Sequence, residues 1–389
     1  MKKKIIILNN SAKFGGPQKS IIQNINILKN NFEFIIITPK GSSLKNFLEN
    51  NIKCIISPEL PQFENTLFNY YKNFKWLMLF RELIRFFNFS IFLLLNKYSE
   101  ELKKIDIVHA NEINLLPAIF LTKKIIKPKN LVSHCRSLQN DENTFLSKIL
   151  KKLYNNILDS VICIDHVVAN SISSDVKKKI IYNSIHEFEI ISRPRSDNKF
   201  IIGIAGNMAD VKGTDFIIET FRELKNRNIK NIFLYFLGDV PKNSFVSSVA
   251  NKIGVRRNYN EYLKNLKNLE NIFFLGFRNK IDYFYQNIDL LCFPTQINAV
   301  GRTVIEAAQF KVPSLITVNS NINDLDIANS TNSFFFNGRN QKKLADMIIE
   351  ISKNQLNRKH IGERIFSDIQ KKCNAKINSE KLSSIYSSF

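Results

Sequence analysis

The chain has 389 residues, 44% of them hydrophobic and 23% charged, a composition that excludes a disordered or fibrous protein. This length is large for one hydrophobic core, so we expect two domains of roughly 180 residues each. The formal net charge of +22 fits attraction to anionic lipid or phosphorylated ligands, or the Lys-, Ile- and Asn-rich composition that an AT-rich genome produces.

Three features bear on partners and compartment. The lysines are spread along the chain without an RNA-binding or helix-turn-helix pattern, so we expect no nucleic-acid partner. The five cysteines are scattered and never form a CxxC pair, which argues for a reducing compartment and against a disulfide framework or a zinc site. The opening "MKKKIIILNN" has an apolar run too short for a signal peptide, so we expect a first buried strand and a cytoplasmic protein.

Short apolar runs alternate with helical patterns from end to end. The predicted strands cover 4–8, 32–38, 52–57, 105–110, 130–135 and 160–164, and then 200–206, 232–238, 272–276, 289–294 and 313–318. The predicted helices between them include 16–29, 213–228, 300–310 and 341–353. Near-continuous apolar strands are typical of a parallel sheet covered on both faces, so the predicted class is α/β and doubly wound.

One stretch bears on membranes. Residues 72–96, "KNFKWLMLFRELIRFFNFSIFLLLN", set aromatic side chains among lysines and arginines. The uncharged runs fall short of the roughly 20 residues that span a bilayer. The stretch therefore predicts either an interfacial helix on an anionic membrane surface or a helix buried on the N-terminal sheet.

The polar stretch 192–199, "SRPRSDNK", predicts the domain boundary, because the strand–helix alternation restarts after it. We expect an N-terminal domain over 1–192, a second domain over 199–370, and a C-terminal helix over 371–389 that packs back toward the first domain. In open parallel sheets ligands bind at the carboxyl ends of the strands, so we expect the strand-end loops of both domains to face a cleft.

Three strand-end loops favour phosphate. Gly15 and Gly16 open a helix after the first strand, and Lys212 and Gly213 precede a helix in "IIGIAGNMADVKGTDFIIETF". In "FPTQINAVGRTVIEAAQFKVP", Gly301 enters a helix whose first N–H groups lack partners. Each loop has a plainer alternative: a simple strand-to-helix turn, a solvated lysine, and an i,i+4 ion pair between Arg302 and Glu306.

At these residues the sequence resembles the retaining GT-B glycosyltransferases, the "glycosyl transferases group 1" of family four. In the second half the matching segments are "GIAGNMADVKGTDFIIETF", "YFLGD", "NIFFLGF", "DLLCFPT", "NAVGRTVIEAAQFKVPSLIT" and "FFFNGRNQKKLADMI". In the first half they are "FGGPQKSI", "DIVHANE", "LVSHCRS" and "KKIIYNSI". The resemblance covers most of the chain and implies two Rossmann-like domains that close across a cleft.

The resemblance implies roles for single residues. Glu306 would hold the ribose hydroxyls of a nucleotide sugar, since a carboxylate accepts well from a vicinal diol. Lys212 would bind the diphosphate, and His134 would serve the sugar at the catalytic centre. The remaining donor-side residues would be Gly16, Gly206, Asn207, Val300, Gly301 and Arg302, and the acceptor side would include His109 and Arg136. From the residues alone, His134 reads as a strand-end histidine without a role.

Two positions depart from the family pattern. Asn298 stands where the first glutamate of an E-x7-E motif is expected, and Asn207 replaces an arginine that follows the strand-end glycine. Asn298 is uncharged, so it could hydrogen-bond sugar hydroxyls but not supply charge. Because the family's arginine is absent at position 207, Lys212 would be the main cation for the diphosphate. Arg302 could substitute for the missing arginine.

The resemblance implies transfer of a sugar, with retention, from a nucleotide diphosphate sugar to a glycan or lipid-linked acceptor in cell-surface polysaccharide synthesis. We expect no metal or cofactor, because no Asp-x-Asp site stands at a strand end. We expect a cytoplasmic enzyme that can associate with the inner face of the membrane. Two alternatives stay open: a nucleotide-sugar epimerase of the same architecture, and a non-catalytic protein that binds a nucleotide sugar or glycan.

Overall fold

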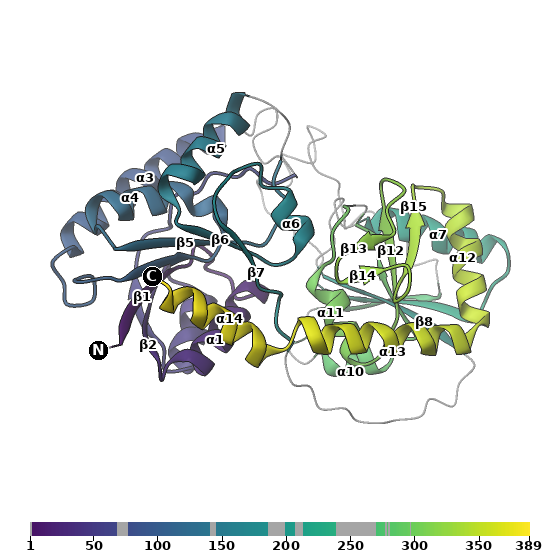
Figure 1. Cartoon of the computed structure of the whole chain (residues 1–389). Coiled ribbons are helices and arrows are strands. Elements are labelled where there is room, and N and C mark those ends of the chain that lie inside the picture. The colour runs from purple at the N-terminus through teal and green to yellow at the C-terminus, as the bar shows by residue number, and fades with distance from the viewer. Residues whose placement is uncertain are drawn as a thin grey trace. The chain divides into compact units, whose positions relative to one another are not determined.

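The computed structural model describes residues 2–67, 77–140, 145–185, 199–206, 213–238, 270–276, 278, 281–295 and 297–389. The chain divides into two compact units (Figure 1). Unit 1 comprises Met1–Ser184 together with Cys373–Phe389, and unit 2 comprises Ile185–Lys372. The boundary predicted over 192–199 lies outside the described residues except for Lys199.

Unit 1 is built on a seven-stranded parallel sheet in the order β3-β2-β1-β4-β5-β6-β7. Its strands are β1 (Lys3–Leu8), β2 (Phe32–Thr38), β3 (Lys53–Ile56), β4 (Ile107–Ala110), β5 (Asn130–Cys135), β6 (Ser160–Cys163) and β7 (Lys178–Ile180). The strand order reverses between β1 and β4, and such a reversal opens a crevice at the carboxyl ends of the strands. The loops after β1 and β4 are therefore the first place to look for a ligand in this unit.

Helices cover both faces of this sheet (Figure 1). One face carries α1 (Gly16–Leu28), α2 (Ser42–Glu49) and the C-terminal α14 (Ala375–Ser387), and their apolar residues form one buried cluster with β1 and β2. The other face carries α3 (Leu77–Asn96), α4 (Leu116–Ile125) and α5 (Phe145–Ile157), whose buried residues include Phe89, Leu93 and Tyr154. A 3-10 turn, η2 (Ile113–Leu115), and a short α6 (His166–Asn170) complete the unit.

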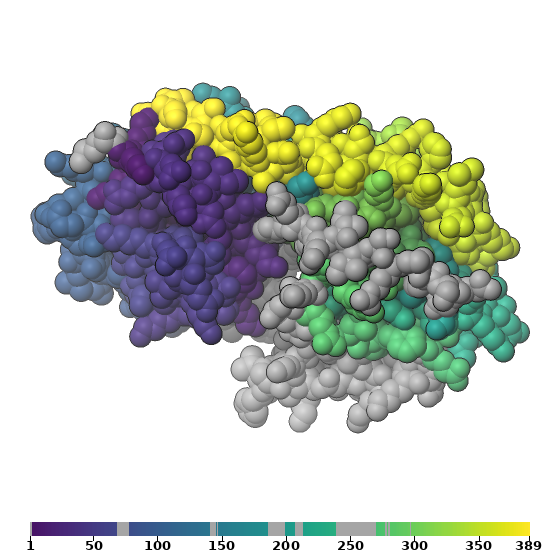
Figure 2. Space-filling view, turned by 90° about the horizontal axis from the view of Figure 1, so that it is seen from below, coloured from purple at the N-terminus to yellow at the C-terminus, as the bar shows by residue number. Residues whose placement is uncertain are grey.

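The C-terminal segment returns to the start of the chain. α14 packs along α1, and Leu382, Ile385 and Tyr386 enter the buried cluster of β1 and β2. The space-filling view in Figure 2 shows the yellow end of the chain lying directly on the purple N-terminal elements. Residues 371–389 do not form one helix, because Lys371 and Lys372 belong to the preceding helix α13 (Gln355–Lys372).

Unit 2 has a six-stranded parallel sheet in the order β10-β9-β8-β11-β12-β15. Its strands are β8 (Phe200–Ala205), β9 (Ile232–Leu237), β10 (Ile272–Gly276), β11 (Leu290–Phe293), β12 (Ser314–Val318) and β15 (Phe334–Asn337), and a small hairpin pairs β13 (Asp324–Leu325) with β14 (Ala328–Asn329). Every strand predicted from the sequence has a counterpart in the two sheets. The edge strands β7 and β15 were not predicted.

The two faces of the unit 2 sheet are covered by different helices. α7 (Thr214–Asn226) and α12 (Gln341–Lys353) pack into a core that also contains Ile202 and Ile204 of β8. Gly203 lies between these two residues and so faces the opposite side, where a Cβ would come within 2.8 Å of Phe284 and Ile288. The small residue lets α10 (Asp282–Gln286) pack directly on the strand, beside α11 (Arg302–Gln309).

Candidate functional site

The carboxyl edge of the unit 2 sheet brings together two of the predicted loops. Gly206 ends β8 with φ +130°, and its N–H donates to the Leu237 carbonyl at 2.8 Å. Residues 207–212 follow and lie outside the described residues, so the structure does not place Asn207 or Lys212. Gly213 then caps α7 in the left-handed region at φ +64°.

Gly213 lies against the end of β11. A Cβ added there would stand 1.7 Å from the Pro294 carbonyl oxygen, closer than any real contact. Only glycine allows this approach, because it has no Cβ and adopts positive φ without strain. The close contact fixes the start of α7 beside the loop that follows β11, so the two predicted phosphate-binding loops adjoin.

Glu306 lies in the second turn of α11, behind the helix start at Gly301. Its Oε1 accepts from Arg302 Nε at 3.2 Å, and its Oε2 accepts from the Tyr285 hydroxyl at 2.9 Å. The side chain is 14% exposed. Burial, and then the neighbouring carboxylate, raise the pKa of Tyr285 well above its usual value, so this hydroxyl remains a donor.

The i,i+4 ion pair with Arg302 is thus confirmed, and it does not exhaust the carboxylate. Two carboxylate oxygens offer about four acceptor positions. The hydrogen bonds of Glu306 to Arg302 and Tyr285 use two of them. Arg302 and Tyr285 can therefore hold Glu306 in place while its remaining acceptor positions receive hydrogen bonds from hydroxyl groups of a ligand.

Asn298 connects two strand-end loops. Its Nδ2 donates to Ser320 Oγ at 2.9 Å, and its Oδ1 accepts from the Asn319 backbone N–H at 3.2 Å. The amide thus ties the loop after β11 to the loop after β12. A carboxylate at this position could only accept hydrogen bonds, so it could not donate as the Asn298 amide does. The departure from the family pattern therefore changes both the hydrogen bonds that hold this loop and the charge of the side chain at position 298.

Val300 and Gly301 complete the loop. Val300 is buried, and a Cβ at Gly301 would meet the Phe293 ring at 2.5 Å, so the loop folds tightly over the end of β11. Gly301 is the N-cap of α11, and no side chain in the described part of the chain caps that helix. The first turn of α11 therefore presents backbone N–H groups and a positive helix end at this edge.

Three buried hydroxyls lie in the same region. Thr214 begins α7, Thr295 follows β11, and Thr303 lies in the first turn of α11. Their Oγ1 atoms are buried, and none has a hydrogen-bond partner within the residues that the structure covers. Buried polar atoms without partners are rare in folded proteins and are concentrated at functional sites.

The strand ends of unit 1 hold two histidines in contact. His109 and His134 are the next-to-last residues of β4 and β5, and their rings stack with centroids 5.1 Å apart. His109 Nε2 lies 3.0 Å from His134 Nδ1, and His109 Nδ1 lies 2.5 Å from the hydroxyl of Tyr386 on α14. All three side chains are buried. The C-terminal helix is therefore connected to the strand-end histidine by hydrogen bonds.

The protons in this chain can be arranged in either of two directions, and the direction in which the Tyr386 hydroxyl donates gives its buried proton an acceptor. Burial, reinforced by the charge of Arg136, lowers the pKa of His109 to about 3 and that of His134 well below its usual value, so both rings are neutral. Tyr386 is a phenol whose pKa is raised by burial, and it has one proton to donate. If it donates to His109 Nδ1, then His109 Nε2–H donates to His134 Nδ1. We therefore assign the proton of His134 to Nε2, as a donor for a ligand.

The acceptor-side role predicted for His109 stays a prediction. In the structure both of its ring nitrogens are engaged within unit 1, by Tyr386 and His134. Its partner Tyr386 could not be found by sequence reasoning, since 277 residues separate the two.

Arg136 and Glu112 complete the unit 1 strand ends. Arg136 donates through Nε and Nη2 to the Asn111 carbonyl and side chain at 3.1 and 3.0 Å, and through Nη1 to Asn183 Oδ1 at 3.3 Å. Glu112 accepts from the backbone N–H groups of Ile113 and Arg136, and burial raises the pKa of its carboxyl to about 7. The sequence analysis missed Glu112, although it ends the quoted segment "DIVHANE".

Gly16 lies at the first position of α1, after the N-cap Gly15 and before Pro17. As in α11, no side chain of the described residues caps this helix. The proposed contact of Gly16 with phosphate stays a prediction.

Comparison with known proteins agrees with this architecture. Residues 186–367 match the family model described as "Glycosyl transferases group 1". The chain is 22% identical over 289 residues to the Escherichia coli O-antigen biosynthesis glycosyltransferase WclY, covering 69% of this chain and 76% of WclY. It is 23% identical over 193 residues to the Staphylococcus aureus capsular polysaccharide biosynthesis glycosyltransferase CapM, covering 50% of this chain and 47% of CapM.

Among solved structures, Anabaena HepE in complex with UDP matches with a TM-score of 0.73 and 16% identity, covering 99% of this chain and 100% of HepE. The predicted GT-B fold, with two parallel-sheet α/β domains, is confirmed. The family match and the curated relatives support a glycosyltransferase of polysaccharide biosynthesis.

The neutral histidine pair predicts a pH effect on stability. The unfolded chain protonates its histidines below about pH 6.5, whereas the folded chain keeps His109 neutral down to about pH 3 and His134 neutral to well below 6.5. Unfolding therefore takes up protons below pH 6.5, and the free energy of unfolding falls there by up to about 1.4 kcal/mol per pH unit for each ring. Melting temperatures between pH 7.5 and 5 should fall less steeply in His134→Gln than in the wild type.

The exposed His166 on α6 provides the control for this prediction. His166→Gln should keep the slope of the wild type, because this exposed residue lies outside the buried histidine pair. Equal slopes in His134→Gln and the wild type would contradict the assignment of a neutral buried pair.

Proposed function

We propose that the chain is a retaining hexosyltransferase that moves a sugar from a nucleotide diphosphate sugar to a hydroxyl of a glycan or lipid-linked acceptor. The observation that carries the proposal is the position of Glu306, a largely buried carboxylate one turn behind the start of α11. It lies at the carboxyl edge of a parallel sheet, inside the segment that matches the glycosyltransferase family model. Relatives are named for O-antigen and capsular polysaccharide biosynthesis, which supports a product in cell-surface polysaccharide synthesis.

On this proposal unit 2 binds the donor. Glu306 accepts hydrogen bonds from the ribose hydroxyls, and the first turn of α11 with Val300, Gly301 and Arg302 holds the diphosphate. Further donor contacts come from Lys212 as a point charge and from Gly206, Asn207 and, in unit 1, Gly16. Asn298 positions the loop after β11, and its amide oxygen or nitrogen can hydrogen-bond the sugar.

In the transfer step the acceptor hydroxyl forms a bond to the anomeric carbon as the bond from that carbon to the diphosphate oxygen breaks. The bonding pair leaves with the nucleoside diphosphate, whose new charge is stabilised by Lys212, Arg302 and helix N-termini. The acceptor proton passes to the departing phosphate oxygen. The Nε2–H of His134 donates to a hydroxyl of the sugar, and Arg136 and Glu112 line the acceptor side.

We propose that no metal ion is needed, because cationic side chains and helix ends supply the positive charge at the diphosphate. Addition of EDTA should leave the rate unchanged, and a rate restored only by Mg²⁺ or Mn²⁺ would contradict this point. We place the enzyme in the cytoplasm, at the inner face of the membrane. No helix in the part of the chain that the structure describes is long and apolar enough to cross a bilayer.

The test is a panel of UDP-, GDP- and ADP-sugars incubated with and without a glycan acceptor, with release of nucleoside diphosphate as the readout. We expect release that requires the acceptor, and a product whose anomeric configuration by NMR equals that of the donor. The double variant Lys212→Ala, Glu306→Ala should lose this activity, and full activity in it would contradict the proposal. Turnover of the donor without an acceptor would favour the epimerase. Binding of the donor without turnover would favour the non-catalytic alternative.

A further inference from the structure

The outer surface of α3 is apolar along most of its length, with Asn88 as an exposed polar residue. Its exposed side chains recur at intervals of three or four residues, so they form one stripe on the helix: Phe80, Leu83, Ile84, Phe87, Ile91 and Leu95. Phe87 is 59% exposed and Leu95 is 79% exposed. The opposite side of the helix is buried through Phe89 and Leu93 in the core of unit 1.

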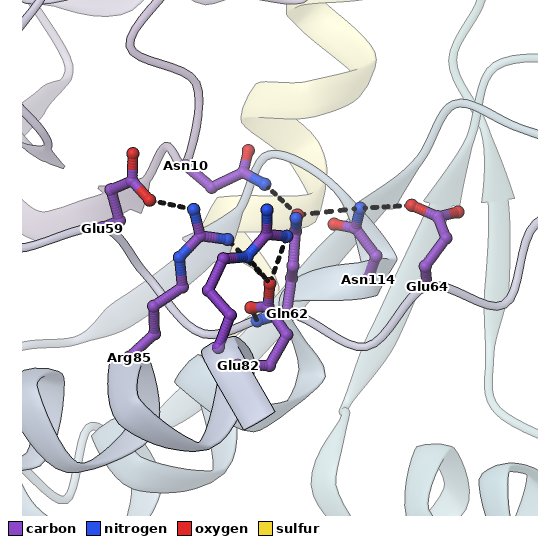
Figure 3. A network of polar contacts seen from close by, with 8 residues as sticks. Asn10, Glu59, Gln62, Glu64, Glu82, Arg85 and Asn114 are labelled. Carbon is purple, nitrogen blue, oxygen red and sulfur yellow. Dashed lines mark hydrogen bonds and ion pairs between the residues drawn. The ribbon is translucent and has the colours of Figure 1, made fainter. Parts of the chain in front are cut away.

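A polar network fixes which side of α3 faces outward (Figure 3). Glu82 is 6% exposed, and its Oε1 accepts from Arg81 Nη2 at 2.6 Å and from Arg85 Nη1 at 2.7 Å. Its Oε2 accepts from the backbone N–H of Gln62, in the loop that follows β3. Arg85 also pairs with Glu59 of that loop. These bonds hold the only acidic side chain of α3 inward, so the apolar stripe remains outside.

The same network extends to the strand ends of unit 1. Gln62 Oε1 accepts from Asn10, which follows β1, at 2.6 Å, and Asn114 of η2 lies 3.3 Å from Glu64 Oε2 (Figure 3). α3 is therefore fastened at its N-terminal end to the edge of the sheet where this fold binds ligands. Movement of the helix away from the unit would break the bonds of Glu82 to Gln62 and of Arg85 to Glu59.

The neighbouring helices extend this surface. α3, α4 and α5 lie side by side on one face of the sheet (Figure 1). Apart from the buried Glu82, none of the three helices contains an acidic residue. α4 exposes Lys124 and α5 exposes Lys148 and Lys152, and Phe145 is exposed at the start of α5.

We propose that the outer surface of α3, α4 and α5, here named the α3–α5 surface, docks on an anionic phospholipid bilayer. A continuous apolar stripe of this length is unusual on a soluble monomer and marks an interaction surface. Its lysines are complementary to anionic headgroups, and α3, α4 and α5 carry no exposed carboxylate of their own, although the exposed Glu59 and Asp175 pair with Arg85 and Lys151. The stripe enters the boundary of headgroups and acyl chains, and the lysines contact the headgroups.

Docking on a bilayer deepens the proposed function, because a lipid-linked acceptor lies in the bilayer. The biological purpose of the docking therefore rests on the proposed function. The docking itself needs neither donor nor turnover. The docking test can therefore fail while transferase activity is still observed, and transferase activity can be absent while docking is still observed.

The test is co-sedimentation of the full-length chain with vesicles of phosphatidylcholine alone, and with vesicles in which about one third is phosphatidylglycerol. We expect binding to the anionic vesicles only, weakened by added salt. The variant Phe87→Ser, Ile91→Ser should bind about tenfold more weakly, because it removes two side chains of the stripe and none of the core. Lys148→Glu, Lys152→Glu should weaken the anionic binding by a similar factor.

The matched control is Leu356→Ser, which removes an exposed leucine of α13 in unit 2 and should bind as the wild type does. Melting temperatures of all variants should stay within a few degrees of the wild type, which shows that they are folded. Equal binding to both kinds of vesicle, or undiminished binding by the two variants, would overturn the proposal. So would a dimer in analytical ultracentrifugation that Phe87→Ser, Ile91→Ser abolishes, since a second copy would then cover the stripe.

Discussion

Glu306→Ala is expected to weaken the binding of UDP at least about 100-fold. A carboxylate that accepts from two ribose hydroxyls makes two charge-assisted hydrogen bonds, each worth about 1.5–3 kcal/mol, and a loss of 1.4 kcal/mol is a factor of about ten in affinity. Isothermal titration calorimetry with UDP measures the effect directly, with GDP and ADP as alternatives if UDP does not bind.

The substitution also disturbs unit 2, so controls must separate folding from binding. Without Glu306 the buried Tyr285 hydroxyl loses its acceptor and Arg302 loses its partner, at a cost of about 1–3 kcal/mol. Glu306→Gln keeps the size of the side chain and one acceptor oxygen, so it should fold well and still lose about tenfold in affinity. Tyr285→Phe removes the second contact and leaves the carboxylate, so it should bind UDP nearly normally.

A matched carboxylate elsewhere in unit 2 completes this experiment. Glu223 on α7 accepts from Arg227 Nε at 2.8 Å, four residues away, as Glu306 accepts from Arg302. Glu223→Ala should cost no more than about 1 kcal/mol of stability and leave UDP affinity unchanged. Equal affinity in Glu306→Ala and Glu223→Ala would show that Glu306 serves only the ion pair, which is the plainer alternative that the sequence left open.

The region around Glu306 shows which features of the site could be predicted from the sequence and which could not. A strand, a proline, a polar loop and a helix were predicted over 293–313, because apolar periodicity, Pro294 and Gly301 are local signals. The partner Tyr285 was not predicted, because it lies 21 residues from Glu306 and tertiary packing alone brings α10 to α11. The contact of Asn298 with the next strand-end loop likewise joins residues whose neighbourhood is set by the order of the strands.

Unit 1 repeats this division between local and long-range signals. A helix was predicted over 72–96, of which the structure describes 77–96, but whether its aromatic side faced the core or the outside depended on Glu82 and its contacts with Gln62 and two arginines. His134 was proposed through a family resemblance, and its connection to Tyr386 runs through His109, which lies 277 residues from Tyr386 in the chain. The missed strand β7 is short and rich in lysine, so its apolar period is too weak to read.

Gly213→Ala is expected to destabilise unit 2 by more than about 3 kcal/mol. Two costs add: an alanine in the left-handed region is strained by about 1–2 kcal/mol, and its Cβ would overlap the Pro294 carbonyl oxygen at 1.7 Å. That oxygen belongs to the backbone at the end of β11, so it cannot rotate away as a side chain would. The start of α7 and the loop after β11 must separate, which also pulls apart the two predicted phosphate-binding loops. Urea unfolding measures the loss of stability, and calorimetry with UDP measures the loss of binding.

Gly276→Ala isolates the clash from the backbone strain. Gly276 has almost the same backbone angle, φ +67°, and a Cβ there meets no atom of the described structure within 4 Å. It should therefore cost only the left-handed strain of about 1–2 kcal/mol. The difference between the two variants is the steric cost of a Cβ against the Pro294 carbonyl, and no difference would mean that Gly213 and Pro294 are not in close contact. Because that contact joins the two donor-side loops, we expect UDP affinity to fall in Gly213→Ala and to persist in Gly276→Ala, even where both variants remain folded.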